Sequence, residues 1–152
     1  MEVYDSIDEL NQEDAFLLSE ARSVTQFAYA PYSNFQVGAV AKLSNGEVVS
    51  GTNQENASYP AGICAERSLL SSAASLHPGI AIDTMAITYN NLKGDSDTPV
   101  SPCGICRQSI NEFQNRFRQP IRIILSGMKG KVQVIENASS LLPLAFTSED
   151  LK

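Results

Sequence analysis

Basic residues are scarce in this sequence, and so are long apolar runs. The 152 residues include 11 Lys and Arg against 17 Asp and Glu, which gives a formal net charge of -6. Nucleic-acid binding draws much of its affinity from basic side chains at phosphates, so no nucleic-acid partner is expected. No stretch approaches the roughly 20 apolar residues that cross a bilayer, so no membrane partner is expected either. A small, weakly charged substrate fits this balance better.

One group of basic residues departs from this trend. Arg116, Arg118 and Arg122 lie close together in the sequence. They are compatible with a local basic patch or with the solvated end of a helix. We favour the second interpretation, because a charge run usually covers an exposed face.

Cysteine is sparse as well, with three residues, and histidine occurs once. The residues from Met1 to Asp8 are acidic. They lack the basic segment followed by an apolar segment that is typical of a signal peptide. We therefore expect a cytoplasmic location, where disulfides are rare. An odd number of cysteines in that setting indicates metal binding or catalysis rather than a disulfide scaffold.

Apolar periodicity and turn residues divide the chain into alternating helices and strands. A helix is expected over 11–29, because apolar residues recur at helical spacing until Pro31 ends it. Asn45 and Gly46 form a strong hairpin signal between two strands. The pattern predicts strands over 37–43, 47–52, 84–89, 121–125 and 131–135, and further helices over 64–76, 103–117 and 139–142. This order predicts an α/β fold, a three-layer α/β/α sandwich with a mixed five-stranded sheet, formed by one domain over residues 1–152.

Two segments place cysteines where a loop gives way to a predicted helix. They are Cys64-Ala65-Glu66 and Pro102-Cys103-Gly104-Ile105-Cys106. The spacing of Cys103 and Cys106 puts both sulfurs on one face of a first helical turn. Helix N-termini carry partial positive charge, which favours thiolate over thiol. Two such helix ends, meeting from separate helices, could supply three sulfur ligands to one cation.

The number of ligands separates a structural from a catalytic metal site. Structural zinc sites have four protein ligands, whereas catalytic ones keep a position for water. His77 is the obvious fourth candidate, but it lies thirteen positions after Cys64 on the same predicted helix, or roughly 20 Å away. With one position open, Glu66 can act as the general acid and base. Arg67 can offset the negative charge of three thiolates.

Each of these residues also has a simpler interpretation. A Cys-x-x-Cys pair alone is compatible with a thiol oxidoreductase. Glu66 and Arg67 alone are compatible with ordinary charges in a first helical turn. The combination of Cys-x-Glu and a distant Pro-Cys-x-x-Cys is far more specific, because it is the known signature of zinc deaminases in its three-cysteine variant.

With these residues in place, the chain resembles the small cytidine deaminases, the homotetrameric type with a three-cysteine zinc site. The resemblance covers nearly the whole chain. It is carried by the segments 30–39, 53–60, 62–67, 101–108 and 141–151. It implies an α/β/α sandwich and one Zn²⁺ per chain, held by Cys64, Cys103 and Cys106, with Glu66 as the catalytic proton carrier.

The resemblance also implies how a substrate is held. It assigns substrate binding to Phe35, Asn53, Glu55, Tyr59, Ala65 and Phe146. Asn53 and Glu55 would bind the ribose hydroxyls, and an amide beside a carboxylate suits paired hydroxyls chemically. The Ala65 backbone N–H would bind the base carbonyl. From the residues alone, Phe35 fits core packing before a strand better than base binding.

Two of these positions are implied to act between subunits. Tyr59 would lie at a neighbouring subunit's site, and Phe146 would reach into an adjacent subunit's pocket. The implied assembly is therefore a homotetramer with shared active sites. From sequence alone, Tyr59 is equally compatible with other roles.

The implied activity is zinc-dependent hydrolytic deamination of cytidine and deoxycytidine to uridine and deoxyuridine, with release of ammonia, in pyrimidine salvage. One alternative is a deaminase of another aminated nucleoside, such as a nucleoside antibiotic. A second is a noncatalytic zinc-stabilised binding protein, which would have no need for Glu66 beside an open metal position. A third is a thiol oxidoreductase, which one zinc per chain would argue against.

Overall fold

A six-stranded mixed sheet forms the centre of the computed structural model, which describes residues 1–152. Its strands lie in the order β1-β6-β5-β4-β2-β3. Only β4 and β5 run parallel, while every other neighbouring pair is antiparallel. The strands are β1 (Glu2–Tyr4), β2 (Phe35–Leu43), β3 (Val48–Thr52), β4 (Ile82–Asn91), β5 (Arg122–Ser126) and β6 (Val132–Ile135).

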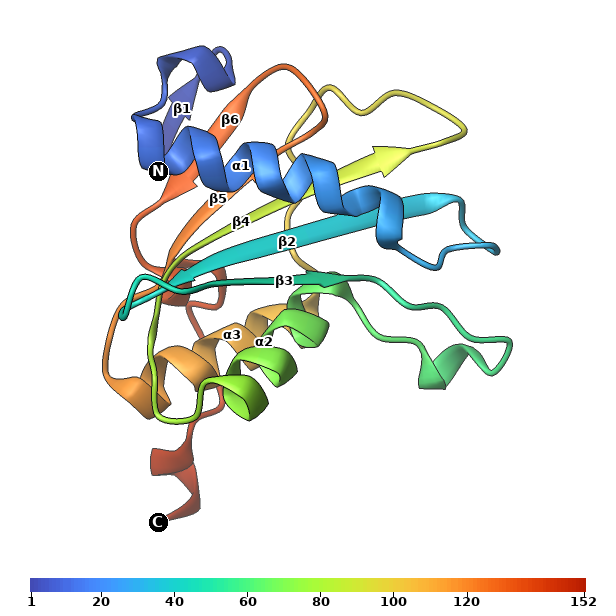
Figure 1. The fold of residues 1–152 in the computed structure, drawn as a ribbon. Coiled ribbons are helices and arrows are strands. Elements are labelled where there is room, and N and C mark those ends of the chain that lie inside the picture. Colours follow the sequence, from blue (N-terminus) through green and yellow to red (C-terminus); the bar gives the residue numbers. More distant parts are fainter.

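Helices cover both faces of this sheet. Helix α1 (Gln12–Val24) lies on one face, and α2 (Ala65–Leu76) and α3 (Gly104–Phe117) lie together on the other (Figure 1). Short 3₁₀ helices complete the chain at Ile7–Glu9, Thr25–Phe27, Tyr59–Ala61, Ala138–Leu141 and Ser148–Leu151. No helix is both long and apolar enough to cross a membrane.

Each face of the sheet has its own hydrophobic core. Because successive side chains of a strand point to opposite faces, β4 contributes Met85 and Ile87 to one core and Ala86 to the other. The core under α2 and α3 contains 18 buried residues, whereas the one under α1 contains 8. The larger core therefore supports the helices that begin with the cysteine segments.

A glycine sets how closely α2 approaches the sheet. A Cβ added at Gly51 of β3 would lie 2.5 Å from the Ala65 carbonyl oxygen and 2.5 Å from the Leu69 backbone nitrogen. Carbon atoms do not approach backbone atoms this closely without displacement, so only glycine allows this packing. Gly51 thereby fixes the distance between the sheet and the first turn of α2, which follows directly after Cys64.

The three-layer α/β/α class predicted from the sequence is confirmed, and the strand count needs one correction. The sheet has six strands rather than five, because Glu2–Tyr4 pairs with β6 at the sheet edge. Three residues are too few to show an alternating pattern, so this strand was not predictable from periodicity. The helix expected over 11–29 ends at Val24 and continues as one 3₁₀ turn.

Candidate metal centre and substrate cavity

Three cysteine sulfurs meet where the N-termini of α2 and α3 come together. Cys64 is the N-cap residue of α2, Cys103 is the N-cap residue of α3, and Cys106 lies in the first turn of α3. The Cys64 and Cys103 Sγ atoms are 3.8 Å apart, and all three sulfurs lie within 4.8 Å of one another. The predicted grouping of these residues is therefore present in the structure.

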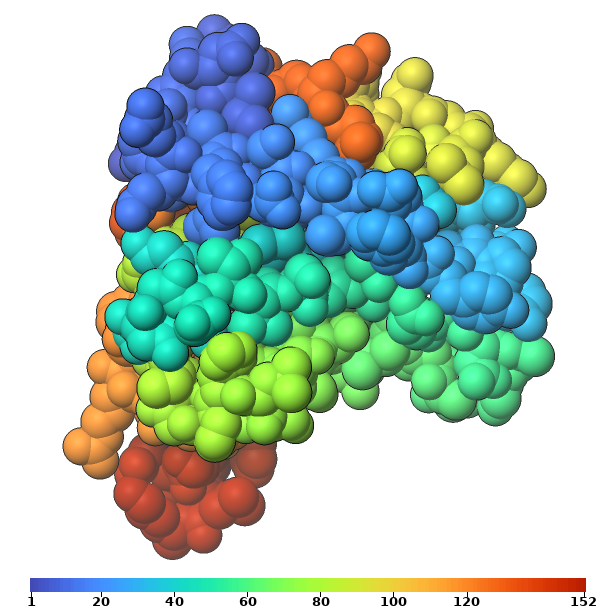
Figure 2. Space-filling model, viewed as in Figure 1, coloured from blue at the N-terminus to red at the C-terminus, as the bar shows by residue number.

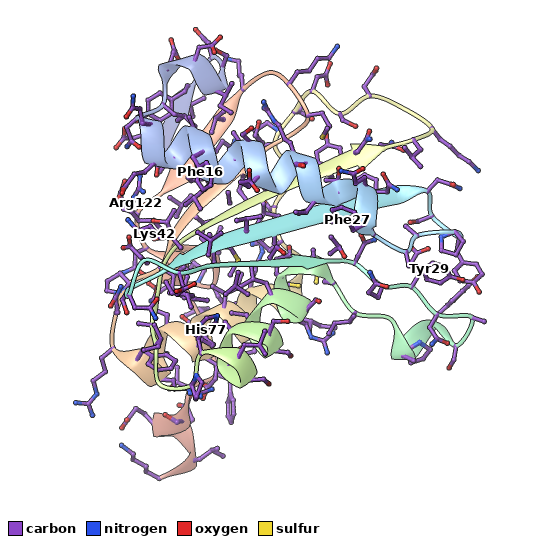
Figure 3. All side chains as sticks on the ribbon, viewed as in Figure 1. Phe16, Phe27, Tyr29, Lys42, His77 and Arg122 are labelled. Atoms are coloured by element: carbon purple, nitrogen blue, oxygen red, sulfur yellow. The ribbon has the colours of Figure 1, made fainter.

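The sulfur spacing fits a tetrahedral zinc ion. Two ligands at the usual Zn–S distance of about 2.3 Å are separated by about 3.8 Å at the tetrahedral angle. His77 does not complete the set, because it is the C-cap of α2 and lies at the opposite end of that helix from Cys64 (Figure 3). The cluster thus offers three protein ligands, the number typical of catalytic zinc.

The surroundings of the sulfurs favour thiolate. Neither Cys64 nor Cys103 makes a side-chain cap hydrogen bond, so both helix ends direct free N–H groups and partial positive charge to the cluster. A hydrogen bond from Cys106 lowers the pKa of the Cys64 thiol to about 6, and the positive charge of Arg67 also lowers it. A hydrogen bond to Cys64 and burial raise the pKa of Cys106. Cys64 is therefore the sulfur most readily deprotonated before a metal binds.

Glu66 lies beside the sulfurs with its side chain largely withdrawn from solvent. The residue is 5% exposed. Burial raises the pKa of its carboxyl above the ordinary value, and the negative charge of Cys64 raises it further. A buried carboxyl next to a metal site is suited to carrying protons between water and a substrate.

A cavity of about 150 Å³ opens between the sheet and these helix ends. Cys64, Glu66 and Cys103 line its polar side. The sheet side is apolar, with Phe35 and Val37 from β2 and Ile87 and Tyr89 from β4, and Val100 and Ser101 line it from the loop before α3. The Phe35 and Tyr89 rings are stacked, with centroids 4.8 Å apart and planes 7° from parallel.

Asn53 and Glu55, predicted to bind ribose, hold the loops at the mouth of this cavity. The Asn53 amide oxygen accepts from the Val37 N–H at 2.8 Å, and its nitrogen donates to the Phe35 carbonyl at 2.9 Å. The Glu55 carboxylate accepts from the backbone of Tyr32 and Ser33 and from the Ser33 hydroxyl at 2.6 Å. That hydroxyl lowers the pKa of Glu55.

A second, wider hollow of about 360 Å³ lies between these loops. Glu55 and Tyr59 line it together with Tyr32, Ser33, Asn56 and Gly62. Figure 2 shows the loop near residue 30, in light blue, beside the loop near residue 58, in sea green. Of the predicted substrate residues, Phe35 and Ala65 therefore line the small cavity at the sulfurs, Glu55 and Tyr59 line the open hollow, and Asn53 lines neither.

Phe146 lies apart from both cavities, on the exposed C-terminal tail. The residue is 60% exposed, and the Gln108 side chain donates to its carbonyl at 2.9 Å. The tail protrudes beneath the helices, in red in Figure 2. Within one chain, Phe146 is not brought to the sulfur cluster. Its predicted role stays a prediction about a second subunit.

Comparison with known proteins gives the family. The family model for the cytidine and deoxycytidylate deaminase zinc-binding region matches residues 11–118. The chain belongs to this deaminase family. It is 41% identical to a cytidine deaminase of Halalkalibacterium halodurans over 89% of this chain and 95% of that protein, and 37% identical to one of Sporosarcina psychrophila over 89% and 92%. The crystal structure of a cytidine deaminase from Burkholderia pseudomallei, 36% identical, matches with a TM-score of 0.75 over 90% of this chain and all of that one.

Membership in the deaminase family confirms zinc as the cofactor. The matched family region is defined by zinc binding, and the three cysteines are positioned to hold one metal ion. The spacing of the Cys64 and Cys103 sulfurs fits that ion. Of the three clustered arginines, Arg122 is not free to form a basic patch, because it pairs with Asp14 of α1 and with Glu136, which follows β6.

Two residues near the deaminase site were not found by sequence reasoning. Tyr89 stacks on Phe35 in the cavity, but the sequence marks it only as one residue of an alternating strand. Arg107 donates to the Pro102 carbonyl at 2.8 Å and to the Leu141 carbonyl at 3.1 Å, so it braces the turn before Cys103 against the tail. Arg67, which was expected to pair with the sulfurs, acts on Cys64 through its charge.

Proposed function

We propose that this protein deaminates cytidine and deoxycytidine hydrolytically, giving uridine and deoxyuridine with release of ammonia. The observation that carries the proposal is the three-sulfur cluster beside buried Glu66, at the end of a cavity of about 150 Å³. The cytidine deaminases that resemble this chain over about nine tenths of its length support the same reaction.

The reaction exchanges an amine for an oxygen at C4 of the pyrimidine ring. Zinc, when bound by Cys64, Cys103 and Cys106, supplies Lewis acidity that eases deprotonation of the attacking water. The water oxygen bonds to C4, and the bond from C4 to the amine nitrogen breaks. One proton of the water ends on ring N3 and the other on the departing ammonia. Glu66 is the group placed to carry both protons.

The sizes of the two cavities support separate binding places for the base and the ribose of the substrate. Ligand pockets usually measure about 300–1,000 Å³, so the inner cavity suits a pyrimidine base rather than a whole nucleoside. The base would enter beside Phe35, with the Ala65 backbone N–H near its carbonyl, at the first turn of α2. The ribose would lie at the mouth, where Asn53 and Glu55 hold the loops.

We also propose a homotetramer in which neighbouring subunits complete the sites. Tyr59 is 75% exposed and Phe146 is 60% exposed, and aromatic side chains this exposed are enriched at protein interfaces. A single catalytic domain in the cytoplasm, acting in pyrimidine salvage, fits three free cysteines, which a reducing compartment keeps available for metal.

Incubation of zinc-loaded protein with cytidine, followed by ultraviolet absorbance and an ammonia assay, tests the activity. Glu66→Gln should retain one zinc per chain and lose about 10²–10⁴-fold in kcat, the usual contribution of a positioned proton carrier. Glu47→Gln, in the exposed turn between β2 and β3, is the matched control and should keep parental turnover. Equal turnover by Glu66→Gln and the parent would disprove the mechanism.

Two outcomes of that assay would favour the alternatives. Deamination of another aminated nucleoside without turnover of cytidine would identify a different substrate. One zinc per chain with no turnover of any aminated nucleoside in a panel would indicate a zinc-stabilised binding protein.

A further inference from the structure

Tyr89 is a buried aromatic residue of the cavity for which the proposed reaction gives no role. It is 6% exposed and lies on β4 directly opposite Val37 of β2. Phe35 is its diagonal neighbour on the same face of the sheet, within the reach of an aromatic side chain. The nearly parallel stack of the two rings, at 4.8 Å, makes Tyr89 the support on which the Phe35 ring lies.

The hydroxyl end of Tyr89 holds the loop that supplies Val100 to the cavity lining. It donates to the Thr98 carbonyl at 2.8 Å, in the loop between β4 and α3. This loop continues through Val100 and Ser101, which line the cavity, to Cys103. One side chain therefore links the aromatic platform, the sheet and the segment that leads to a metal ligand.

The chemistry of the base indicates which edge faces this assembly. In the proposed reaction, C4 and N3 are turned to the sulfurs and Glu66, and N1 carries the sugar to the mouth. The carbonyl at C2 faces the Ala65 backbone. Only the apolar C5–C6 edge is left. The apolar part of the lining matches this edge chemically, and it includes Phe35, Tyr89 and Val100.

We propose that Tyr89 is a specificity-determining residue that limits the size of group accepted at C5 of the pyrimidine. This inference rests on the proposed deamination. Tyr89 acts in two ways: its ring fixes the plane of Phe35, and its hydroxyl keeps the loop with Val100 closed against the base. Replacing the ring by a smaller, flexible side chain gives the Phe35 ring and the loop with Val100 room to move apart.

The test compares cytidine with 5-iodocytidine in the parent, Tyr89→Leu and Tyr89→Phe. We expect Tyr89→Leu to raise the ratio of kcat/KM for 5-iodocytidine to that for cytidine by about tenfold, within the range known for small changes of pocket size. The intrinsic effect of iodine on reactivity cancels, because each variant is compared with the parent. Tyr89→Phe keeps the ring and loses only the Thr98 contact, so we expect it to raise the same ratio, but by less than Tyr89→Leu does.

Phe117→Leu is the matched control. It removes a partly buried aromatic ring that packs on Phe113 at the far end of α3. Its distance from Cys103 along the helix is about 20 Å. This variant should lose stability without changing the ratio of the two substrates. If Tyr89→Leu does not fold, Tyr89→Met replaces it, because methionine adapts to irregular core space.

The outcomes separate this inference from the proposed function. An unchanged ratio in Tyr89→Leu, with one zinc per chain, would overturn the role of Tyr89 and leave the deamination intact. If the parent does not convert cytidine, the proposed function fails. Calorimetric binding of uridine and 5-iodouridine then tests Tyr89 separately, and equal selectivity in the parent and Tyr89→Leu would overturn its role.

Discussion

The N-termini of the helices on the two faces of the sheet are built differently. Helix α1 begins at Asn11, whose side chain accepts a hydrogen bond from the Asp14 N–H at 2.9 Å. Helices α2 and α3 begin at Cys64 and Cys103, and neither side chain caps its helix. A good N-cap stabilises a protein by about 1 kcal/mol. The face with α1 uses this contribution for stability, while the other face leaves its helix ends free for chemistry.

The charged residues divide in the same way. Below α1, the Asp14 carboxylate receives two hydrogen bonds from Arg122, at 2.9 and 3.0 Å, and fastens the helix to β5. On the other face, buried Glu66 has no basic partner among the ion pairs of the structure. A paired buried charge holds a fold together, whereas an unpaired one remains available to exchange protons.

The largest effect should follow from removing a sulfur on the catalytic face. We expect Cys106→Ser to weaken zinc binding by more than about 100-fold, the upper limit typical of losing a group that only supports a ligand. Turnover should fall with the zinc content, measured by atomic absorption on dialysed protein. His77→Ala, at the other end of α2, should bind zinc like the parent. Full zinc occupancy in Cys106→Ser would show that the sulfur cluster is not the metal site.

A smaller effect, on stability alone, is expected from the face with α1. Asp14→Asn leaves the half-buried Arg122 with the exposed Glu136 as its one charged partner and should lower the free energy of unfolding by about 2 kcal/mol. Urea unfolding of the zinc-loaded protein measures this, and kcat should not change. Lys42→Met removes two ion pairs with more exposed carboxylates, Glu13 and Asp83, and should cost less than about 0.5 kcal/mol. A fall in kcat for Asp14→Asn would contradict the separation of the two faces.

The smallest effect tests the caps directly, in metal-free protein. Cys103→Asn should raise the free energy of unfolding by about 0.5 kcal/mol, because asparagine caps the helix end that cysteine leaves open. Asn11→Ala should lower it by about 1 kcal/mol. Both are measured by urea unfolding with excess chelator. If Cys103→Asn is no more stable than the parent, the contrast between the two kinds of helix end is wrong.

The metal centre was the part of the protein best predicted from sequence. Cys103 and Cys106 are three residues apart, and Cys64 precedes a second helix, so local geometry nearly determines how the sulfurs are presented. The roles of Asn53 and Glu55 are different. Their side chains hydrogen-bond to backbone groups sixteen or more residues away, and such contacts leave no local pattern in the sequence.

Residues whose role depends on strand register could not be predicted. Tyr89 meets Phe35 because β2 and β4 pair with Val37 opposite Tyr89. A shift of one residue would turn the ring to the other core. β1 was not predicted, because its three residues form a strand through pairing with β6 and show no apolar pattern of their own. The way in which several subunits assemble depends on the shape and chemistry of their surfaces, and the apolar periodicity of the sequence does not describe these.

The contacts of Arg107 and Gln108 have a practical consequence for anyone who modifies this protein. Both residues lie on α3 directly after Cys106, and they hold the carbonyls of Leu141 and Phe146 in the tail. A fusion partner attached after Lys152 would pull on the helix that carries two of the three sulfurs. Affinity tags and reporters are therefore better joined before Met1, which leads into the edge strand β1 and takes part in neither of these hydrogen bonds.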